Sequence, residues 1–153
     1  MQGSQSVHGV PRPGSGCPQR PRVKSLRFHR RPMNFELSQR FFFDAAHTLR
    51  REIDQEGSLR IHGHTYHAAV FVRGDPDPAT GMILDLGLLN QVIERVRYQL
   101  DHRFLDEVTE LGPPTLESLC KFILRKVMEA FPGVTRVRVE RRATGDACDL
   151  YVH

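Results

Sequence analysis

Residues 47–66, HTLRREIDQEGSLRIHGHTY, join the two segments around which the rest of the chain is organised. Apolar and polar residues alternate from Asn34 to Phe43, which predicts a strand that delivers Ala45-Ala46-His47 to its end. The β-branched and aromatic residues from His64 to Arg73 predict a second strand. Residues 48–58 between them are polar and charged, and a loop of this length is typical of a functional site.

Beyond the second strand, the pattern predicts a turn, more sheet and a helix. Gly, Pro and Asp fill residues 74–81 and indicate a turn. Met82-Ile83-Leu84 is expected to continue the sheet. Asp85 is the expected N-cap of a helix from Leu86 to Leu100, because apolar residues recur there at helical spacing.

The last part of the chain predicts a helix followed by a hairpin. Thr115 is the expected N-cap of the helix, and Phe131-Pro132-Gly133 ends it. Val134–Arg141 alternates as a strand, and Cys148–Val152 is expected to pair back onto it. The order β-β-α-α-β-β predicts an α+β fold, with an antiparallel four-stranded sheet and both helices on one face.

Charge is divided unevenly along the chain, whose formal net charge is +4. Residues 1–32 hold seven of the 22 Lys and Arg residues and none of the 18 Asp and Glu residues. The predicted domain over residues 33–153 is therefore mildly acidic, and nucleic acid is not its expected partner. No apolar run approaches the roughly 18 residues of a membrane span. Three scattered cysteines fit a reducing, cytoplasmic setting.

Residues 1–32 contain five prolines and four glycines, and we expect a disordered basic tail. Three interpretations stay open: a floppy tail or start misassigned ahead of Met33, a transit peptide, and a basic arm that contacts RNA or DNA. Mass spectrometry of the native N-terminus separates them, since a protein that begins at Met33 excludes the last two.

Three histidines are candidates for a metal site. His62 and His64 are two residues apart, so an extended chain places both on one side of the sheet, and His67 on the other. His47 reaches them if the two strands pair. Three neutral imidazoles hold Zn²⁺ and leave a fourth position for water or substrate. The alternative is three hydrogen-bonded histidines without a metal.

Asp101 and His102 follow the predicted helix over Leu86–Leu100. A carboxylate that accepts a hydrogen bond from an imidazole fixes its tautomer and raises its basicity, which makes His102 a candidate general base. The alternative is a histidine that interacts only with the C-terminal end of the helix dipole.

Together these residues resemble the 6-pyruvoyl-tetrahydropterin synthase family, which includes the bacterial 6-carboxytetrahydropterin synthases of queuosine biosynthesis. The similarity spans Phe35 to about Tyr151. Five ordered segments carry it: Phe43-Asp44-Ala45-Ala46-His47, His62-Gly63-His64-Thr65-Tyr66, Gly74–Gly81 with Ile83-Leu84-Asp85, Leu100-Asp101-His102, and Pro114-Thr115-Leu116-Glu117.

The resemblance implies a T-fold subunit in homo-oligomers that close their sheets into barrels, typically hexamers made of two trimers. It also implies zinc on the three histidines and 7,8-dihydroneopterin triphosphate as the substrate. In the family, protons are moved by a cysteine and by an Asp-His pair that matches Asp101 and His102. Thr115 and Glu117 match positions that contact the pterin.

The chain departs from the family at the cysteine. Carboxy-forming members have it four residues before the first histidine of His-Gly-His, where this chain has Ser58, and mammalian-type members six before, where it has Glu56. A serine hydroxyl is a poor base unless it is activated, whereas a carboxylate can serve directly. Family members with Glu near this position make 6-hydroxymethyl-dihydropterin for folate synthesis, so Glu56 is a candidate base.

The C-terminal strand departs from the family as well, in its V-x-V-x-E pattern. Val137 and Val139 place Arg141 on the face where the family has its glutamate, and Glu140 on the opposite face. Glu140 stays a candidate for substrate binding if a bulge turns it toward the pocket. If Arg141 faces the pocket instead, the ligand is expected to carry an acidic group.

The function that these residues favour is a zinc-dependent, 6-carboxytetrahydropterin synthase-like lyase. One alternative is the same scaffold forming 6-hydroxymethyl-dihydropterin with Glu56 as the base. A second is a zinc-bearing pterin-binding protein that has lost catalysis together with its cysteine.

Overall fold

A five-stranded sheet with the order β3-β1-β2-β4-β5 forms the body of the fold. The structure is a computed structural model that describes residues 35–50, 52–53 and 55–152, so the expected tail over 1–32 lies outside it. The elements are β1 Phe35–His47, α1 Gln55–Leu59, β2 His62–Gly74, α2 Leu86–Leu100, β3 Arg103–Phe104, the 3₁₀ helix η1 Leu105–Glu107, α3 Leu116–Met128, β4 Val134–Arg141 and β5 Asp146–Tyr151.

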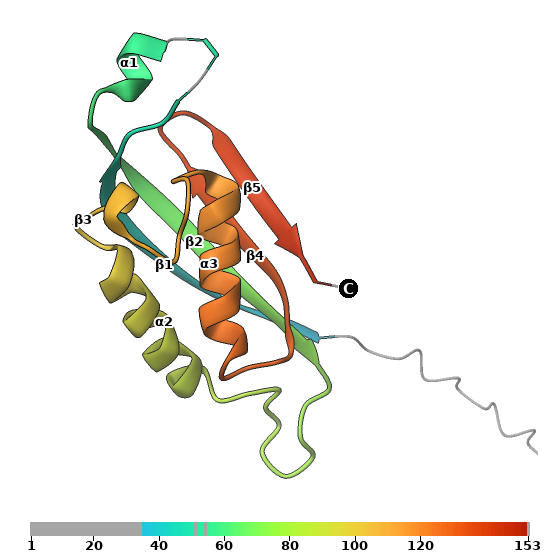
Figure 1. The fold of residues 1–153 in the computed structure, drawn as a ribbon. Helices are drawn as coiled ribbons and strands as arrows, with labels where there is room; N and C mark the ends of the chain where they lie inside the picture. The colour runs from blue at the N-terminus through green and yellow to red at the C-terminus, as the bar shows by residue number, and fades with distance from the viewer. Residues whose placement is uncertain (1–34, 51, 54, 153) are drawn as a thin grey trace, which may run out of the picture. The chain divides into compact units, whose positions relative to one another are not determined.

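The helices α2 and α3 both lie on one face of this sheet (Figure 1), α2 against β1 and α3 against β4 and β5. The Asp85 carboxylate caps α2 by accepting from the Gly87 N–H at 2.7 Å. Thr115 caps α3 by accepting from the Ser118 N–H at 3.2 Å. The predicted span of the first helix is confirmed, because its apolar stripe is buried against the sheet.

The core lies between these helices and the sheet. The strands pair in register from Phe35 opposite Gly74 to His47 opposite His62, so the period of two fixes which side chains face the helices. Core side chains with an exposed fraction of at most 2% come from both layers: Phe43, Tyr66, Val70, Val137, Val139, Leu89, Ile93, Leu119, Phe122 and Ile123.

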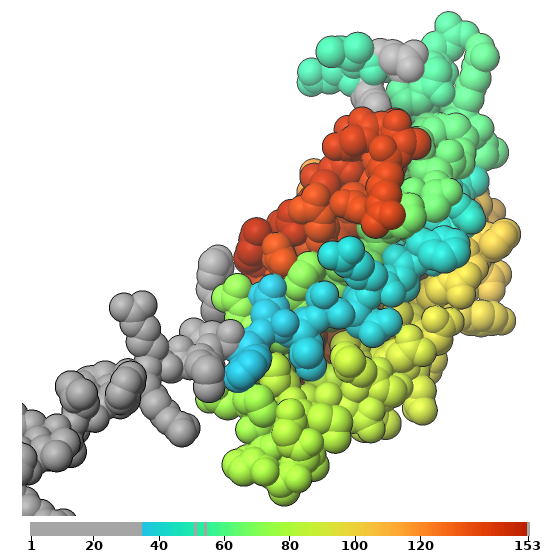
Figure 2. All heavy atoms as spheres, turned by 180° about the vertical axis from the view of Figure 1, so that it is seen from behind, coloured from blue at the N-terminus to red at the C-terminus, as the bar shows by residue number. Residues whose placement is uncertain are grey.

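The other face of the sheet is open to solvent. Figure 2 shows it from behind, with side chains of β1 in blue and of β4 and β5 in orange to red at the surface. Charged residues occupy alternate positions there, and Arg138 pairs with both Glu140 and Asp149. None of the helices within the described residues has the length and apolar character needed to cross a membrane.

The predicted α+β class is confirmed, but the sheet differs from expectation in two places. It is mixed, because β3 pairs in parallel with β1 at Ala45 and Ala46. The expected strand at Met82–Leu84 is wrong: these residues form no strand. The Asp77 carboxylate accepts from the Ala79 and Thr80 N–H groups, and the turn leads straight to the cap of α2. Ile83 and Leu84 pack partly buried against the core without pairing.

Candidate functional site

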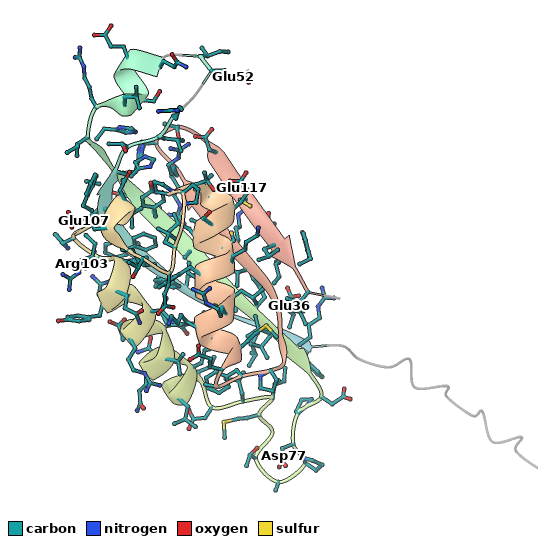
Figure 3. All side chains as sticks on the ribbon, in the orientation of Figure 1. Glu36, Glu52, Asp77, Arg103, Glu107 and Glu117 are labelled. Carbon is teal, nitrogen blue, oxygen red and sulfur yellow. The ribbon has the colours of Figure 1, made fainter. Side chains whose placement is uncertain are left out.

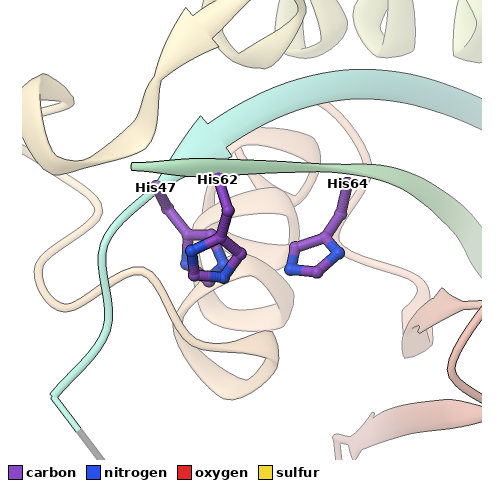
Figure 4. A group of neighbouring side chains, drawn as sticks. All are labelled: His47, His62 and His64. Atoms are coloured by element: carbon purple, nitrogen blue, oxygen red, sulfur yellow. The ribbon is translucent and has the colours of Figure 1, made fainter. Parts of the chain in front are cut away.

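Three histidines at the ends of β1 and β2 project from the same side of the sheet (Figure 4). The ring centroids of His47 and His62 are 4.5 Å apart. The ring centroid of His64 lies 5.1 Å from that of His47 and 5.0 Å from that of His62. One nitrogen from each ring lies within 4.8 Å of the other two. The group can therefore hold a metal ion in the manner of a three-histidine centre.

Backbone carbonyls orient two of these rings. The Nδ1 atom of His47 lies 3.1 Å from the carbonyl oxygen of Pro114, and that of His62 lies 2.8 Å from the carbonyl oxygen of Arg60. A carbonyl only accepts, so each Nδ1 carries the proton and each Nε2 keeps its lone pair. This is the arrangement by which second-sphere groups prepare histidine ligands.

His47 is the most buried member of the group, with 1% of its surface exposed. Burial, followed by the neighbouring His62, lowers the pKa of His47, so its imidazole is uncharged at neutral pH. Its Nε2 atom is buried without a hydrogen-bond partner among the described residues. A buried lone pair without a partner is costly, and a metal ion would satisfy it.

Arg141 lies beside the third histidine. Its Nη1 atom is 3.2 Å from Nε2 of His64, and its Nη2 atom donates to the Asp146 carboxylate at 2.5 Å. Only 9% of Arg141 is exposed. Arginine has donors and no acceptor, so His64 accepts through Nε2. The structure thus places a permanent positive charge on the histidine side of the sheet.

A pocket of about 280 Å³ lies next to His47, bordered by Thr115, Glu117 and Arg141. Figure 3 shows Glu117 at the N-terminal end of α3. The backbone N–H of Glu117 itself, and then the Thr115 hydroxyl, lower the pKa of Glu117. Its carboxylate is therefore ionised at neutral pH and can accept hydrogen bonds from a ligand. Two of the predicted substrate-binding residues are thus brought together with His47.

Glu140 lies elsewhere. It is opposite His67 in the β2–β4 register, on the open face of the sheet. Its carboxylate accepts from Arg142 at 2.8 Å and from Arg138 at 3.1 Å, and these two contacts lower the pKa of Glu140. The structure does not bring Glu140 to the 280 Å³ pocket.

Asp101 and His102 form a pair at the β3 edge of the sheet. Oδ1 of Asp101 lies 3.2 Å from Nδ1 of His102 and accepts from the Asp44 N–H at 3.0 Å. The Asp44 N–H, and then the hydrogen bond with His102, lower the pKa of Asp101. His102 has a left-handed backbone, with φ of 57°, and its N–H donates to the Asp44 carbonyl at 2.6 Å.

The Asp-His pair and the three histidines lie on different sides of the sheet. His102 borders a hollow of about 500 Å³ together with Asp44 and Thr65, and the lining also includes His64. The side chains of Asp44 and Thr65 alternate with those of Ala45 and His64, which face the helices, so the hollow lies on the open face. Figure 3 shows Arg103, the next residue, at this edge. Within one chain, neither Asp101 nor His102 borders the 280 Å³ pocket beside His47.

Glu56 and Ser58 both lie in α1. The Glu56 side chain is 88% exposed and pairs with Arg60 at 2.8 Å. Ser58 is buried, and its carbonyl accepts from the Leu49 N–H at 2.8 Å, which holds the two ends of the loop together. Neither residue borders the 280 Å³ pocket, and their chemical roles stay predictions.

Sequence reasoning missed two residues that contact Asp101. Arg97 donates to Oδ2 of Asp101 at 3.0 Å from one helical turn earlier. The spacing of four residues at which helix side chains meet was a usable signal for this contact. Asp44 contacts Asp101 through its backbone N–H. Every residue except proline has this group, so the side chain at position 44 does not predict the contact.

Two known proteins are similar to this chain in sequence. The chain is 34% identical over 114 residues to a 6-carboxy-5,6,7,8-tetrahydropterin synthase of Synechocystis, covering 70% of this chain and 86% of that protein. It is 30% identical over 106 residues to a dihydroneopterin monophosphate aldolase of Pyrococcus furiosus, covering 69% of this chain and 86% of the relative.

The fold matches solved structures too. The structure of the Caenorhabditis elegans 6-pyruvoyl tetrahydropterin synthase aligns with a TM-score of 0.69 at 24% identity, over 79% of this chain and 97% of that chain. The family model for 6-pyruvoyl tetrahydropterin synthase matches residues 36–150, which include the three histidines, the Asp-His pair and Glu117. The chain therefore belongs to the 6-pyruvoyl tetrahydropterin synthase family.

Proposed function

We propose that this protein is a zinc-dependent, 6-carboxytetrahydropterin synthase-like lyase that acts on 7,8-dihydroneopterin triphosphate in the cytoplasm, within queuosine or other pterin biosynthesis. The observation that carries the proposal is the three-histidine group, with its uncharged, unpartnered His47 nitrogen, beside the ionised Glu117. The Synechocystis relative supports the carboxy-forming reaction, because the alignment covers 86% of its length.

Each pocket residue has a part in the proposal. His47, His62 and His64 hold the zinc ion, which when bound polarises the hydroxyl and carbonyl oxygens of the substrate side chain. The Glu117 carboxylate accepts paired N–H bonds from the aminopyrimidine edge of the pterin. Thr115 fixes the first turn of α3 and thereby the position of Glu117.

The proton-transfer step is assigned to Asp101 and His102. The Asp101 carboxylate holds the Nδ1 proton of His102, which leaves Nε2 as the base. Since one chain keeps this pair on the open face, the proposal requires a homo-oligomer in which one copy brings its His102 to the pocket of another. A hexamer of two trimers is the assembly that we propose.

A second candidate is formation of 6-hydroxymethyl-dihydropterin with Glu56 as the base. Two observations favour it: Ser58 stands where carboxy-forming members have their cysteine, and the Pyrococcus relative is named an aldolase of dihydroneopterin monophosphate. The contact between Glu56 and Arg60 is exposed, so its release would cost little.

Product analysis distinguishes these activities. The zinc-loaded protein is incubated with dihydroneopterin triphosphate and, separately, with the monophosphate, and the products are identified by mass spectrometry. Carboxytetrahydropterin supports the first candidate, and 6-hydroxymethyl-dihydropterin that disappears in Glu56→Gln supports the second. Unchanged substrate with measurable binding, lost in Glu117→Gln, would indicate a zinc-bearing pterin-binding protein without catalysis.

Mixed oligomers test the assignment of the Asp-His pair to a second copy. A His47→Ala chain lacks a metal ligand, and a His102→Gln chain lacks the base. Neither variant is expected to be active alone. If the sites are shared between copies, random mixing of the two variants restores about one quarter of the activity of the unaltered protein. No recovery, with mixing verified by native mass spectrometry, would contradict a shared site.

A further inference from the structure

Arg97, near the C-terminal end of α2, contacts three residues: Asp101, Phe42 and Glu94. Its Nη2 atom donates to Oδ2 of Asp101 at 3.0 Å, and its Nε atom donates to the Phe42 carbonyl at 3.0 Å. Its guanidinium carbon lies 5.5 Å from the centroid of the Phe42 ring, and Glu94 is 3.6 Å away. The Arg97 side chain is only 33% exposed, so these contacts hold it against the edge of β1.

These contacts fill both oxygens of the Asp101 carboxylate. Oδ2 is taken by Arg97, while Oδ1 lies between the Asp44 N–H and Nδ1 of His102. Without a donor at Oδ2, the carboxylate could turn about its terminal torsion, which has a broad energy profile. The charge-assisted bond from Arg97 blocks that rotation.

We propose that Arg97 is a positioning residue, which holds the Asp101 carboxylate so that Oδ1 accepts the Nδ1 proton of His102 and leaves Nε2 of His102 free. The catalytic meaning of this arrangement rests on the function proposed above, but the arrangement itself is independent of any substrate. Arg97 touches neither the reacting atoms nor the zinc ligands. It acts through Asp101.

The Phe42 side chain supports this role. It is 51% exposed on the open face of the sheet, where the neighbouring positions of β1 are polar. An exposed phenylalanine gains little from burial, but its ring and its carbonyl together form the surface on which the Arg97 guanidinium rests. Phe42 therefore orients Arg97, as Arg97 orients Asp101.

The tautomer of His102 tests the proposal without any substrate. In selectively ¹⁵N-histidine-labelled protein, long-range ¹H–¹⁵N spectra distinguish the Nδ1–H form from the Nε2–H form, and the His102→Gln spectrum assigns the signal. We expect the Nδ1–H form in the unaltered chain and in Arg97→Lys. In Arg97→Met, we expect His102 to shift to mainly the Nε2–H form.

Arg95→Met is the matched control, because Arg95 is an exposed arginine on the same helix with no side-chain bond to Asp101. It should leave the tautomer unchanged. A dispersed spectrum for Arg97→Met shows that the variant is folded. A His102 that keeps the Nδ1–H form in Arg97→Met, or lacks it in the unaltered chain, would overturn the proposal.

Kinetics supply the second readout. If the unaltered protein forms a pterin product, Arg97→Met should lower kcat by about ten- to a hundredfold, the scale of a small misplacement of a catalytic group. KM should change by less than about twofold, since Arg97 does not contact the substrate. An unaltered protein without turnover would count against the proposed function, while the tautomer result would still decide the role of Arg97.

Discussion

The helix side of the sheet and its β3 edge hold histidines in opposite environments. On the helix side, His47 is buried and uncharged, with a lone pair that lacks a partner. At the edge, the His102 side chain is 80% exposed beside an ionised Asp101 that has a hydrogen bond at each oxygen. The comparison teaches that a strand with a period of two can present metal ligands on one face and frame proton-transfer groups on the other.

The largest expected effect separates catalysis from metal binding. His102→Gln should lower kcat by about 10²- to 10⁴-fold, the usual contribution of a general base. The zinc content measured by elemental analysis should stay unchanged, because His102 does not belong to the three-histidine group. A variant that loses zinc together with activity would break the separation between the two regions.

His47→Ala should weaken zinc binding by more than about a hundredfold, beyond the loss expected for a second-sphere change. The matched control is His67→Gln, because His67 lies on the open face and does not belong to the group. Competition with a zinc chelator measures both affinities. Equal affinities for the two variants would show that the helix-side group is not the metal site.

Arg141→Met should tighten zinc binding by about tenfold, because it removes a positive charge next to His64. Arg142→Met is the control, since Arg142 points to the open face and pairs with Glu140. The same chelator competition applies. Weaker zinc binding in Arg141→Met would mean that Arg141 supports the histidines rather than opposing the ion.

Asp101→Asn should lower the free energy of unfolding at neutral pH by about 1.5–3 kcal/mol, the range for hydrogen bonds to a charged group. The pKa of Asp101 is lowered in the fold, chiefly by the Asp44 N–H. Its stabilisation is therefore present above the unfolded value of about 3.9 and is lost as the pH falls through the native pKa. Urea unfolding at about pH 7 and about pH 3 measures this. A difference between variant and unaltered protein that does not shrink in acid would contradict it.

Much of the fold could be predicted from the sequence, because it depends on local patterns. The helix over Leu86–Leu100 follows from its apolar stripe and from the Asp85 cap. The orientation of Arg141 follows from the alternation of Val137 and Val139, and the grouping of the three histidines from their parity. Each of these inferences uses side chains that follow one another at a regular period.

The missing parts depend on contacts between distant segments. The strand β3 has only two residues, and it exists because Asp101 and His102 bind the backbone of Asp44, 57 residues before Asp101. Two residues are too few to show the alternation of apolar and polar side chains that predicts a strand. Met82–Leu84 has the composition of a strand, but Ile83 and Leu84 pack only partly buried against the core, Met82 is exposed, and the three residues form no strand. The place of the Asp-His pair on the open face followed from neither pattern.

Because side chains alternate along β1, the face to which His47 points depends on whether an odd or an even number of residues is inserted within that strand. Inserting one residue within β1, after Phe43, would turn His47 to the open face if Phe43 stays in the core. Inserting two would keep it on the helix side, and a single insertion would be tolerated only where a bulge absorbs it. Additions to the loop over residues 48–61 leave the parity of both strands unchanged. Homologous chains should therefore vary freely in the length of this loop, while β1 keeps an even step between its aromatic core and its histidine.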